Sequence, residues 1–295
     1  MTDHEIDKQS ITRPDWLDES VWPFTIRTAM VKCSPIAYTD EGEGEVLLLV
    51  HDGMWSFVWG QVIEMLQSRF RVVTLDFPGS GLSPGNDTPV GLKHDSRLLE
   101  GLVDHLGLAD LTLVAHDLGG PVGLGLASRR PELVRGLVLV NSFAWPPHVA
   151  PFRAMMRVMS SAPVRSLNVT TNFLPKATSS RFGVGRHLGE DAKRAFVGPS
   201  DDKQKRRRFH DLMGSVSTES EYLAGLELAL KSTLNGLPVL TVYGERNDPF
   251  GFQARFKEIF PDAEEMVIHK GNHFPMCDDP EGFSNRLTEW HEANL

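Results

Sequence analysis

Three polar residues in widely separated segments have the types and order needed for covalent hydrolysis. Asp117 lies in "LTLVAHDLGGPVGL" (111–124), where an apolar burst runs directly into a carboxylate and two glycines. Asp248 lies in "GERNDPFG" (244–251), and His273 lies in "GNHFPMCDDPEGF" (271–283). A carboxylate nucleophile, a histidine base and an acid that orients the histidine can together form and then hydrolyse an ester. The sequence therefore predicts that these three residues form one catalytic site.

Two of the three residues also have ordinary structural explanations. Aspartate is a preferred residue at the start of a helix, so Asp117 could simply cap the helical stretch that follows it. Asp248 stands at a predicted turn, and Glu245 and Asp262 are rival acids in the same part of the chain. His269 and His273 have the i, i+4 spacing of some zinc sites, but the glycine and asparagine between them break any helix that would align them. We predict no metal.

Short apolar strands separated by longer helical patterns would have to position these residues. Six bursts have this form: "VLLLV" (46–50), "RVVTL" (71–75), "LTLVA" (111–115), "GLVLV" (136–140), "PVLTVYG" (238–244) and "EEMVIH" (264–269). This alternation is typical of parallel strands joined by crossover helices. Two earlier segments, "FTIRTAMVKC" (24–33) and "IAYTDEG" (36–42), are expected to be a pair of entry strands. The prediction is an α/β fold with a mostly parallel, eight-stranded sheet flanked by helices.

The strand pattern is interrupted between about residues 145 and 236, where only helical patterns occur. An interval of that length is too long for a simple connection, so we predict a helical cap at 145–236 inserted into a core domain formed by 1–144 and 237–295. Ligands of open parallel sheets bind beyond the carboxyl ends of the strands. The substrate pocket is therefore expected between cap and sheet.

Composition and charge limit the partners of the chain. The formal net charge of −9 over 295 residues argues against a nucleic-acid partner, which would need a basic surface. Two cysteines, Cys33 and Cys277, cannot form a disulfide framework, and the first ten residues lack the pattern of a signal peptide. No apolar run is long enough to cross a membrane. We expect a soluble cytoplasmic protein of unknown oligomeric state that acts on a small apolar molecule.

The segment around Asp117 has the small-x-nucleophile-x-small pattern of a sharp strand-to-helix turn, in Ala115-His116-Asp117-Leu118-Gly119. Five other segments have the form found in the α/β-hydrolase superfamily: "HDGMWSFVW" (51–59), "LDFPGSGLS" (75–83), "LVNSFAWP" (139–146) and the segments quoted above around Asp248 and His273. With this turn, they make the chain resemble that superfamily. Within that superfamily it resembles the branch that includes haloalkane dehalogenases and epoxide hydrolases. The aspartate at the nucleophile position is specific for this branch.

The resemblance implies roles for individual residues. Asp117 would displace a leaving group and form an ester, and His273, oriented by Asp248, would activate the water that hydrolyses it. The backbone N–H groups of Leu118 and Gly53 would stabilise the resulting oxyanion. No organic cofactor is implied. The family spacing from the end of the preceding strand would place the acid at Asn247, so choosing Asp248 requires a one-residue insertion.

Leu118 departs from the dehalogenase pattern, because dehalogenases usually carry a tryptophan there whose N–H holds the halide. Trp55 and Trp145 are substitute donors or, alternatively, packing residues under the cap. Cleavage of a carbon–halogen or similar bond is the first functional hypothesis. The hypothesis of epoxide hydrolysis is weakened, because epoxide hydrolases of this branch use two cap tyrosines to protonate the opening ring and the presumed cap has a single one, Tyr222. Opening of a β-lactone needs no halide site, and a catalytically silent binding scaffold is the remaining alternative. The basic run at 201–209 is expected to be a solvated face of a cap helix.

Overall fold

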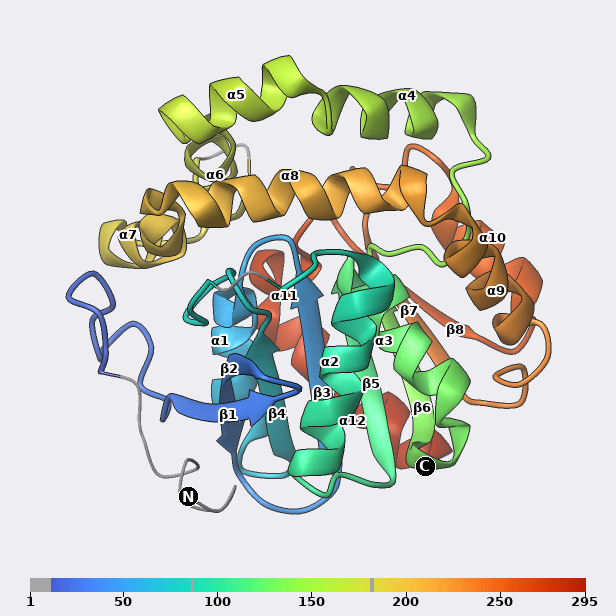
Figure 1. The fold of residues 1–295 in the computed structure, drawn as a ribbon. Coiled ribbons are helices and arrows are strands. Elements are labelled where there is room, and N and C mark those ends of the chain that lie inside the picture. The colour runs from blue at the N-terminus through green and yellow to red at the C-terminus, as the bar shows by residue number, and fades with distance from the viewer. Residues whose placement is uncertain (1–11, 86–87, 181–182) are drawn as a thin grey trace.

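One eight-stranded sheet forms the centre of this computed structural model, which describes residues 12–85, 88–180 and 183–295 (Figure 1). The strands are β1 (Arg27–Val31), β2 (Ser34–Glu41), β3 (Val46–Asp52), β4 (Arg71–Asp76), β5 (Leu111–Asp117), β6 (Val134–Val140), β7 (Val239–Gly244) and β8 (Glu264–Ile268). Their spatial order is β1-β2-β4-β3-β5-β6-β7-β8. β1 pairs antiparallel with β2, β2 pairs antiparallel with β4, and all other neighbours are parallel. The predicted mostly parallel, eight-stranded sheet is confirmed.

Helices cover both faces of the sheet. The helices of the core are α1 (Gly60–Leu66), α2 (Leu92–His105), α3 (Gly119–Arg129), α10 (Phe252–Ile259), α11 (Pro275–Asp278) and α12 (Pro280–Asn294). One buried cluster joins the sheet to α2, α3 and α10, and a second cluster joins its other face to α1 and α12. The central strands are buried on both faces, which explains why they read as unbroken apolar runs in the sequence.

Six helices lie between β6 and β7 among the described residues: α4 (Ala150–Met159), α5 (Ala162–Thr171), α6 (Phe173–Thr178), α7 (Glu190–Val197), α8 (Lys203–Thr218) and α9 (Ser220–Leu230). Figure 1 shows α4, α5 and α8 lying across the edge of the sheet at which β3 and β5 end. By contrast, α9 packs against α3 of the core. The inserted helices therefore sit where the sequence places the substrate pocket.

In the described part of the chain, the connections include four short 3₁₀ helices: η2 (Ser56–Trp59), η3 (Pro131–Leu133), η4 (Val184–Arg186) and η5 (Gly198–Asp201). Within the described part of the chain, none of the helices combines the length and the apolar character needed to cross a bilayer.

Candidate active site

Asp117 stands on a strained turn between β5 and α3. Its backbone has a left-handed conformation, with φ at 51°, which costs energy for a residue other than glycine. The glycines that follow are required by space: a Cβ on Gly119 would lie 2.4 Å from the backbone oxygen of Val50, and one on Gly120 would lie 1.7 Å from Ser142 Oγ. The small-residue pattern in the sequence therefore reflects close contact of this turn with β3 and with the end of β6.

His273 faces Asp117 across the end of the sheet. Its Nε2 lies 3.5 Å from Asp117 Oδ2, and the two side chains retain 36% and 28% of their exposure. Burial raises the pKa of the Asp117 carboxyl, but the charge and hydrogen bond of His273 outweigh it, so that the pKa lies below its usual value. Asp117 is therefore ionised at neutral pH and can act as a nucleophile.

Asn247, not Asp248, lies beside the other ring nitrogen of His273. The amide Nδ2 of Asn247 is 3.1 Å from His273 Nδ1. Both carboxylate oxygens of Asp248 instead accept backbone N–H groups at the start of α10, from Phe252 at 2.7 Å and Gln253 at 3.0 Å. The expectation that Asp248 orients His273 is not met, because the family spacing holds without the assumed insertion and puts an amide at the acid position.

The rival acids do not occupy that position either. Glu245 accepts the backbone N–H of Lys270 and lies 3.1 Å from Nδ1 of His269. Asp262 is an exposed residue between α10 and β8. No carboxylate other than that of Asp117 lies within ion-pair distance of His273 in the described ranges 12–85, 88–180 and 183–295.

A second amide, Asn141 at the end of β6, supports the loop that carries His273. Its Nδ2 donates to the backbone oxygens of Asn272, at 2.8 Å, and His273, at 3.0 Å. Its Oδ1 accepts the backbone N–H of Gly244 at 3.1 Å. Asn141 thus fixes the backbone of the histidine loop to the ends of β6 and β7. These hydrogen bonds involve the backbone of the loop and not the imidazole of His273.

Two buried histidines beneath the site were not singled out from the sequence. His116 Nε2 lies 2.6 Å from the backbone oxygen of His273, and His116 Nδ1 lies 2.9 Å from Nδ1 of His51. Because a carbonyl can only accept, His116 carries its proton on Nε2 and accepts at Nδ1 from His51. Burial lowers the pKa of His51 to about 3 and that of His116 well below its usual value, so both rings are neutral. They anchor the backbone of His273.

The two expected oxyanion donors differ in their availability. The backbone N–H of Leu118 contacts the Asp117 carboxylate, as a donor at this position should. The backbone N–H of Gly53, however, is 2.9 Å from Oδ1 of its neighbour Asp52. Gly53 lines the cavity, but its N–H is already engaged.

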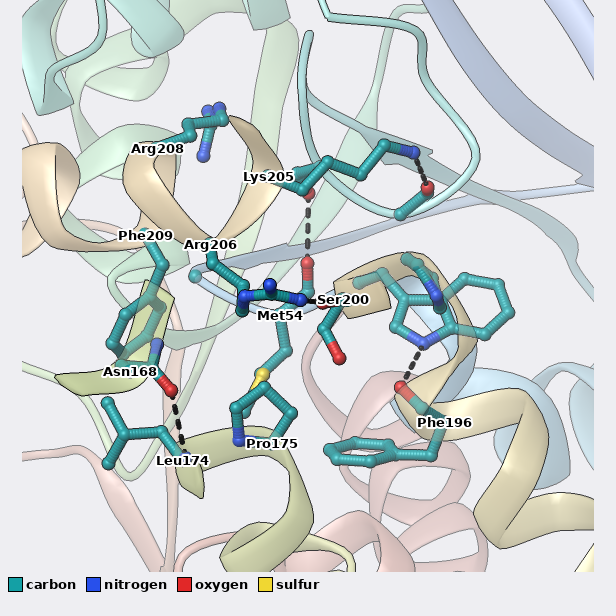
Figure 2. Close-up of a pocket in the computed structure, with 15 residues that line it drawn as sticks. Met54, Asn168, Leu174, Pro175, Phe196, Ser200, Lys205, Arg206, Arg208 and Phe209 are labelled. Atoms are coloured by element: carbon teal, nitrogen blue, oxygen red, sulfur yellow. Dashed lines mark hydrogen bonds between the residues drawn. The ribbon is translucent and has the colours of Figure 1, made fainter. Parts of the chain in front are cut away.

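Neither tryptophan offers a free donor to Asp117. Trp55 Nε1 donates to the backbone oxygen of Phe196 at 3.1 Å, and both residues line a small cavity of about 40 Å³, of which Figure 2 shows the surroundings of Phe196. Trp145 is buried beneath Arg255, whose guanidinium carbon lies 4.4 Å from the ring centre, and it does not line the cavity that holds Asp117. The packing alternative applies to both residues.

The cavity above Asp117 has a volume of about 580 Å³. Asp117, His273, Leu118 and Asn247 lie at its core end, and the inserted helices supply much of the opposite wall. Aromatic and thioether side chains dominate the lining: Phe143, Phe152, Phe209, Phe250, Phe252, Phe274, Met54, Met155, Met156, Met159 and Met213. Such a pocket favours an apolar substrate of small to medium size.

The basic run on α8 is not a solvated face, contrary to expectation. Arg208 is 5% exposed and forms ion pairs with Asp52, at 2.9 Å, and with Asp95 of α2, at 2.8 Å. Arg206 is also buried, and it donates to the backbone oxygens of Val169 and Ser200 beside the small cavity in Figure 2. These cations fasten α8 to its surroundings, which a one-dimensional charge pattern does not reveal.

Among the described residues, no group of three or more histidine, cysteine, aspartate or glutamate side chains is arranged to hold a metal ion.

Comparisons with known proteins agree with this architecture. The family model described as "alpha/beta hydrolase fold" matches residues 46–280. "Haloalkane dehalogenase 2" of Mycobacterium tuberculosis is 30% identical over 280 residues, which cover 92% of this chain and 96% of that protein. "Cis-3-alkyl-4-alkyloxetan-2-one decarboxylase" of Xanthomonas campestris is 28% identical over 278 residues, which cover 88% and 93%. The chain belongs to the α/β-hydrolase family, and within it the chain is similar to haloalkane dehalogenases.

Solved structures show the same fold. The crystal structure of the haloalkane dehalogenase DbeA from Bradyrhizobium elkani superposes with a TM-score of 0.78 at 22% identity, covering 90% of this chain and 96% of that chain. The epoxide hydrolase CorEH superposes with a TM-score of 0.77 at 19% identity, covering 92% and 99%.

Proposed function

We propose that this chain is a hydrolase that forms a covalent ester at Asp117 and hydrolyses it with water activated by His273. The observation that carries the proposal is an ionised carboxylate on a strained turn, 3.5 Å from a histidine and at the core end of an apolar cavity. A carboxylate in this setting can attack a carbon that bears a leaving group. A role as a helix cap alone would not account for the facing histidine.

The reaction has two balanced steps. Asp117 attacks the substrate carbon, a carbon–oxygen bond forms, and the leaving group departs with the bonding electrons. Water then attacks Cγ of the Asp117 ester and gives a proton to His273 Nε2. Collapse of the tetrahedral intermediate breaks the original ester bond, and the alkoxide takes the proton from His273. The products are an alcohol, the released leaving group, the regenerated carboxylate and one proton, which the newly formed carboxylic acid releases to solvent.

The leaving group in the first candidate reaction is a halide that departs readily. Polar side chains on the cavity wall belong to His51, Asp117, Asn141, Thr178, Asn247 and His273. Leucine at position 118 donates through its backbone alone, Trp55 donates to Phe196, and Trp145 is not part of the cavity wall. A missing hydrogen bond to a charged group costs about 1.5–3 kcal/mol. Chloride leaves less readily than bromide or iodide, so this loss should slow the release of chloride most.

Opening of an apolar β-lactone is a second candidate for the same nucleophile. No tryptophan is among the described lining residues, and this favours the lactone reaction, since a lactone keeps its leaving oxygen attached and needs no halide donor. The oxetanone decarboxylase relative supports it. Epoxide hydrolysis has less support, because the hydroxyl of Tyr222 donates to the backbone oxygen of Pro121 and no tyrosine is among the described residues of the cavity wall. A silent scaffold has the least.

We further propose that residues 145–236 act as a cap that closes the cavity over Asp117. In support, the cavity is lined by core residues and by residues of α4, α6 and α8. Its apolar wall would exclude bulk water and strengthen the electrostatic contacts of the reacting groups.

A substrate panel combined with mass spectrometry tests the proposal. Chloro-, bromo- and iodoalkanes, epoxides, β-lactones and esters are offered to the wild type. His273→Ala is then incubated with a substrate that the wild type consumes, and we expect a stable adduct on the peptide containing Asp117. His269→Ala is the matched control, because that side chain is 75% exposed. Consumption of substrate without an adduct in His273→Ala would refute the covalent mechanism.

A further inference from the structure

Asn247 occupies a position at which an acid would normally stabilise the base of this reaction. We propose that Asn247 holds the resting His273 with its proton on Nε2, facing Asp117, and that this makes ester hydrolysis slower than ester formation. The wild type should therefore accumulate the Asp117 ester during turnover. This inference rests on the proposed function and identifies its slow half.

The first support is the environment of Nδ1. The amide nitrogen of Asn247 is the atom placed 3.1 Å from it, and an amide N–H can only donate. Nδ1 of His273 must then offer its lone pair. Because a neutral imidazole carries one proton, that proton resides on Nε2.

The second support is the contact of His273 with Asp117, which does not depend on whether Asn247 presents its amide nitrogen or its amide oxygen to His273. Nε2 of His273 lies 3.5 Å from Asp117 Oδ2, and an ionised carboxylate accepts hydrogen bonds but cannot donate them. A lone pair on Nε2 would face the lone pairs of this carboxylate, whereas a proton there is attracted to it. Both neighbours of the imidazole thus favour the same tautomer.

This tautomer suits the first step but not the second. Attack by Asp117 requires only that its carboxylate is ionised, and the contact with His273 holds the pKa of that carboxyl below its usual value. Activation of water, however, requires a lone pair on Nε2. The proton must therefore move to Nδ1, and Asn247 must rotate its amide so that Oδ1 accepts it.

The imidazolium formed during hydrolysis also lacks a negative partner. Once Asp117 is esterified its charge is lost, and an amide oxygen stabilises a cation less than a carboxylate does. In serine proteases, an amide in place of the acid of the triad lowers kcat by about 10⁴-fold through the wrong tautomer. Hydrolysis here is expected to suffer in the same way.

The oxyanion site adds to the imbalance. The tetrahedral intermediate of hydrolysis needs N–H donors, and the N–H of Gly53 is engaged by Asp52 Oδ1 at 2.9 Å. Loss of one such donor typically lowers turnover by about 10²–10³-fold. Displacement of a leaving group from a saturated carbon forms no oxyanion on Asp117, so the first step is spared.

Tautomer measurement tests the proposal without any substrate. In the wild type labelled with ¹⁵N-histidine, the neutral ring of His273, assigned by its absence in His273→Ala, should show a protonated Nε2 and an unprotonated Nδ1. In Asn247→Asp the proton should move to Nδ1, because a carboxylate can only accept. A protonated Nδ1 in the resting wild type would overturn the proposal, even if Asn247→Asp failed to fold.

Rapid-mixing kinetics test the consequence. A substrate consumed in the panel, with 1-iodohexane tried first, should give a burst of released leaving group equal to the concentration of active sites. Intact-mass spectra taken during turnover should show the ester on the wild type. Asn247→Asp should lose the burst and hydrolyse the ester roughly 10²-fold faster. Its acidic pH limb should move to higher pH, because the new carboxylate favours the imidazolium.

Asn235→Asp is the matched control, since it adds the same charge at an exposed position and should keep the burst. Turnover without a burst in the wild type, while His273→Ala still accumulates the adduct, would overturn this inference and leave the proposed function intact. The absence of an adduct in both proteins would instead refute the proposed function. An unchanged hydrolysis rate in folded Asn247→Asp would also overturn the inference.

Discussion

The ion pairs of Arg208 should make a large contribution to the stability of the folded chain, and replacing Arg208 by methionine tests this. Arg208 on α8 contacts Asp52 at 2.9 Å and Asp95 at 2.8 Å, and Nε donates to the backbone oxygen of Pro78 at 2.7 Å. The side chains of the three ionic residues are at most 5% exposed. Methionine retains the length and most of the packing of arginine but removes the charge.

The expected cost follows from the groups left behind. Removing one partner of a buried ion pair typically costs about 3–5 kcal/mol, because the remaining charge stays buried without compensation. Here two carboxylates would lose their partner. Burial already raises the pKa of Asp95 well above its usual value, so this group can take up a proton and relieve part of the strain. We therefore expect a loss of about 3 kcal/mol at pH 7, near the lower end of that range.

Urea denaturation followed by circular dichroism measures this loss. Arg207→Met on the same helix is the control, because Arg207 is exposed and should change stability by about 0.5 kcal/mol or less. Adding Asp52→Asn and Asp95→Asn to Arg208→Met should recover most of the lost stability, since no buried charge then remains. A carboxyl whose pKa is raised in the folded state lowers the free energy of unfolding more as the pH rises. The stability of Arg208→Met relative to the wild type should therefore partly recover at pH 5. A loss below about 1 kcal/mol, or no recovery in the triple variant, would refute this reasoning.

Two further predictions concern the nucleophile turn and a buried acid. Leu118→Trp should raise turnover of chloroalkanes relative to iodoalkanes by roughly ten- to a hundred-fold, because it adds an N–H near the leaving group. Parallel assays with both substrates measure this ratio. An unchanged ratio in a folded variant would contradict the prediction. Burial raises the pKa of Asp76 to about 6, so its contribution to stability should fall by about 3 kcal/mol as pH rises from about 4 to above 6. The stability difference between wild type and Asp76→Asn should show this slope, and parallel pH curves would exclude it.

The strands could be predicted because their signal is local. Each apolar burst falls on an observed strand, from β3 at Val46–Asp52 to β8 at Glu264–Ile268. The placement of Asp117 and His273 follows from the same logic, since both stand just where parallel strands end. Side chains at such ends meet at one edge of the sheet. Their meeting across 156 residues of sequence was therefore predictable without any knowledge of contacts.

The acid position shows where residue type and spacing conflict. Spacing alone pointed to Asn247, but the expectation of a carboxylate moved the assignment by one residue to Asp248. The backbone decides between them: the side chain of Asp248 turns back to the N–H groups of α10, at 2.7 and 3.0 Å, while that of Asn247 faces His273. A residue that precedes a helix often accepts hydrogen bonds from the first backbone N–H groups of that helix, provided that its side chain is an acceptor. Spacing predicted the residue beside His273 better than residue type did, because the path of the backbone determines which side chain faces the imidazole.

The contacts of α8 could not be predicted, because they depend on a single carboxylate in a distant loop. Asp52 is buried at the end of β3, and a buried carboxylate needs a cation. Arg208 supplies it from the inserted helices, 156 residues later in the chain. The same Asp52 oxygen accepts the N–H of Gly53, so one residue both binds α8 to the core and occupies an expected oxyanion donor. In the proposed reaction, ester hydrolysis therefore lacks the Gly53 donor at this loop, and the amide at Asn247 takes the place of a stabilising carboxylate. In the sheet, β3 with Asp52 lies on one side of β5, and β7, which precedes Asn247, lies on the other. Both residues act on the same half of the proposed reaction, which is why the fate of the ester is the most informative quantity to measure.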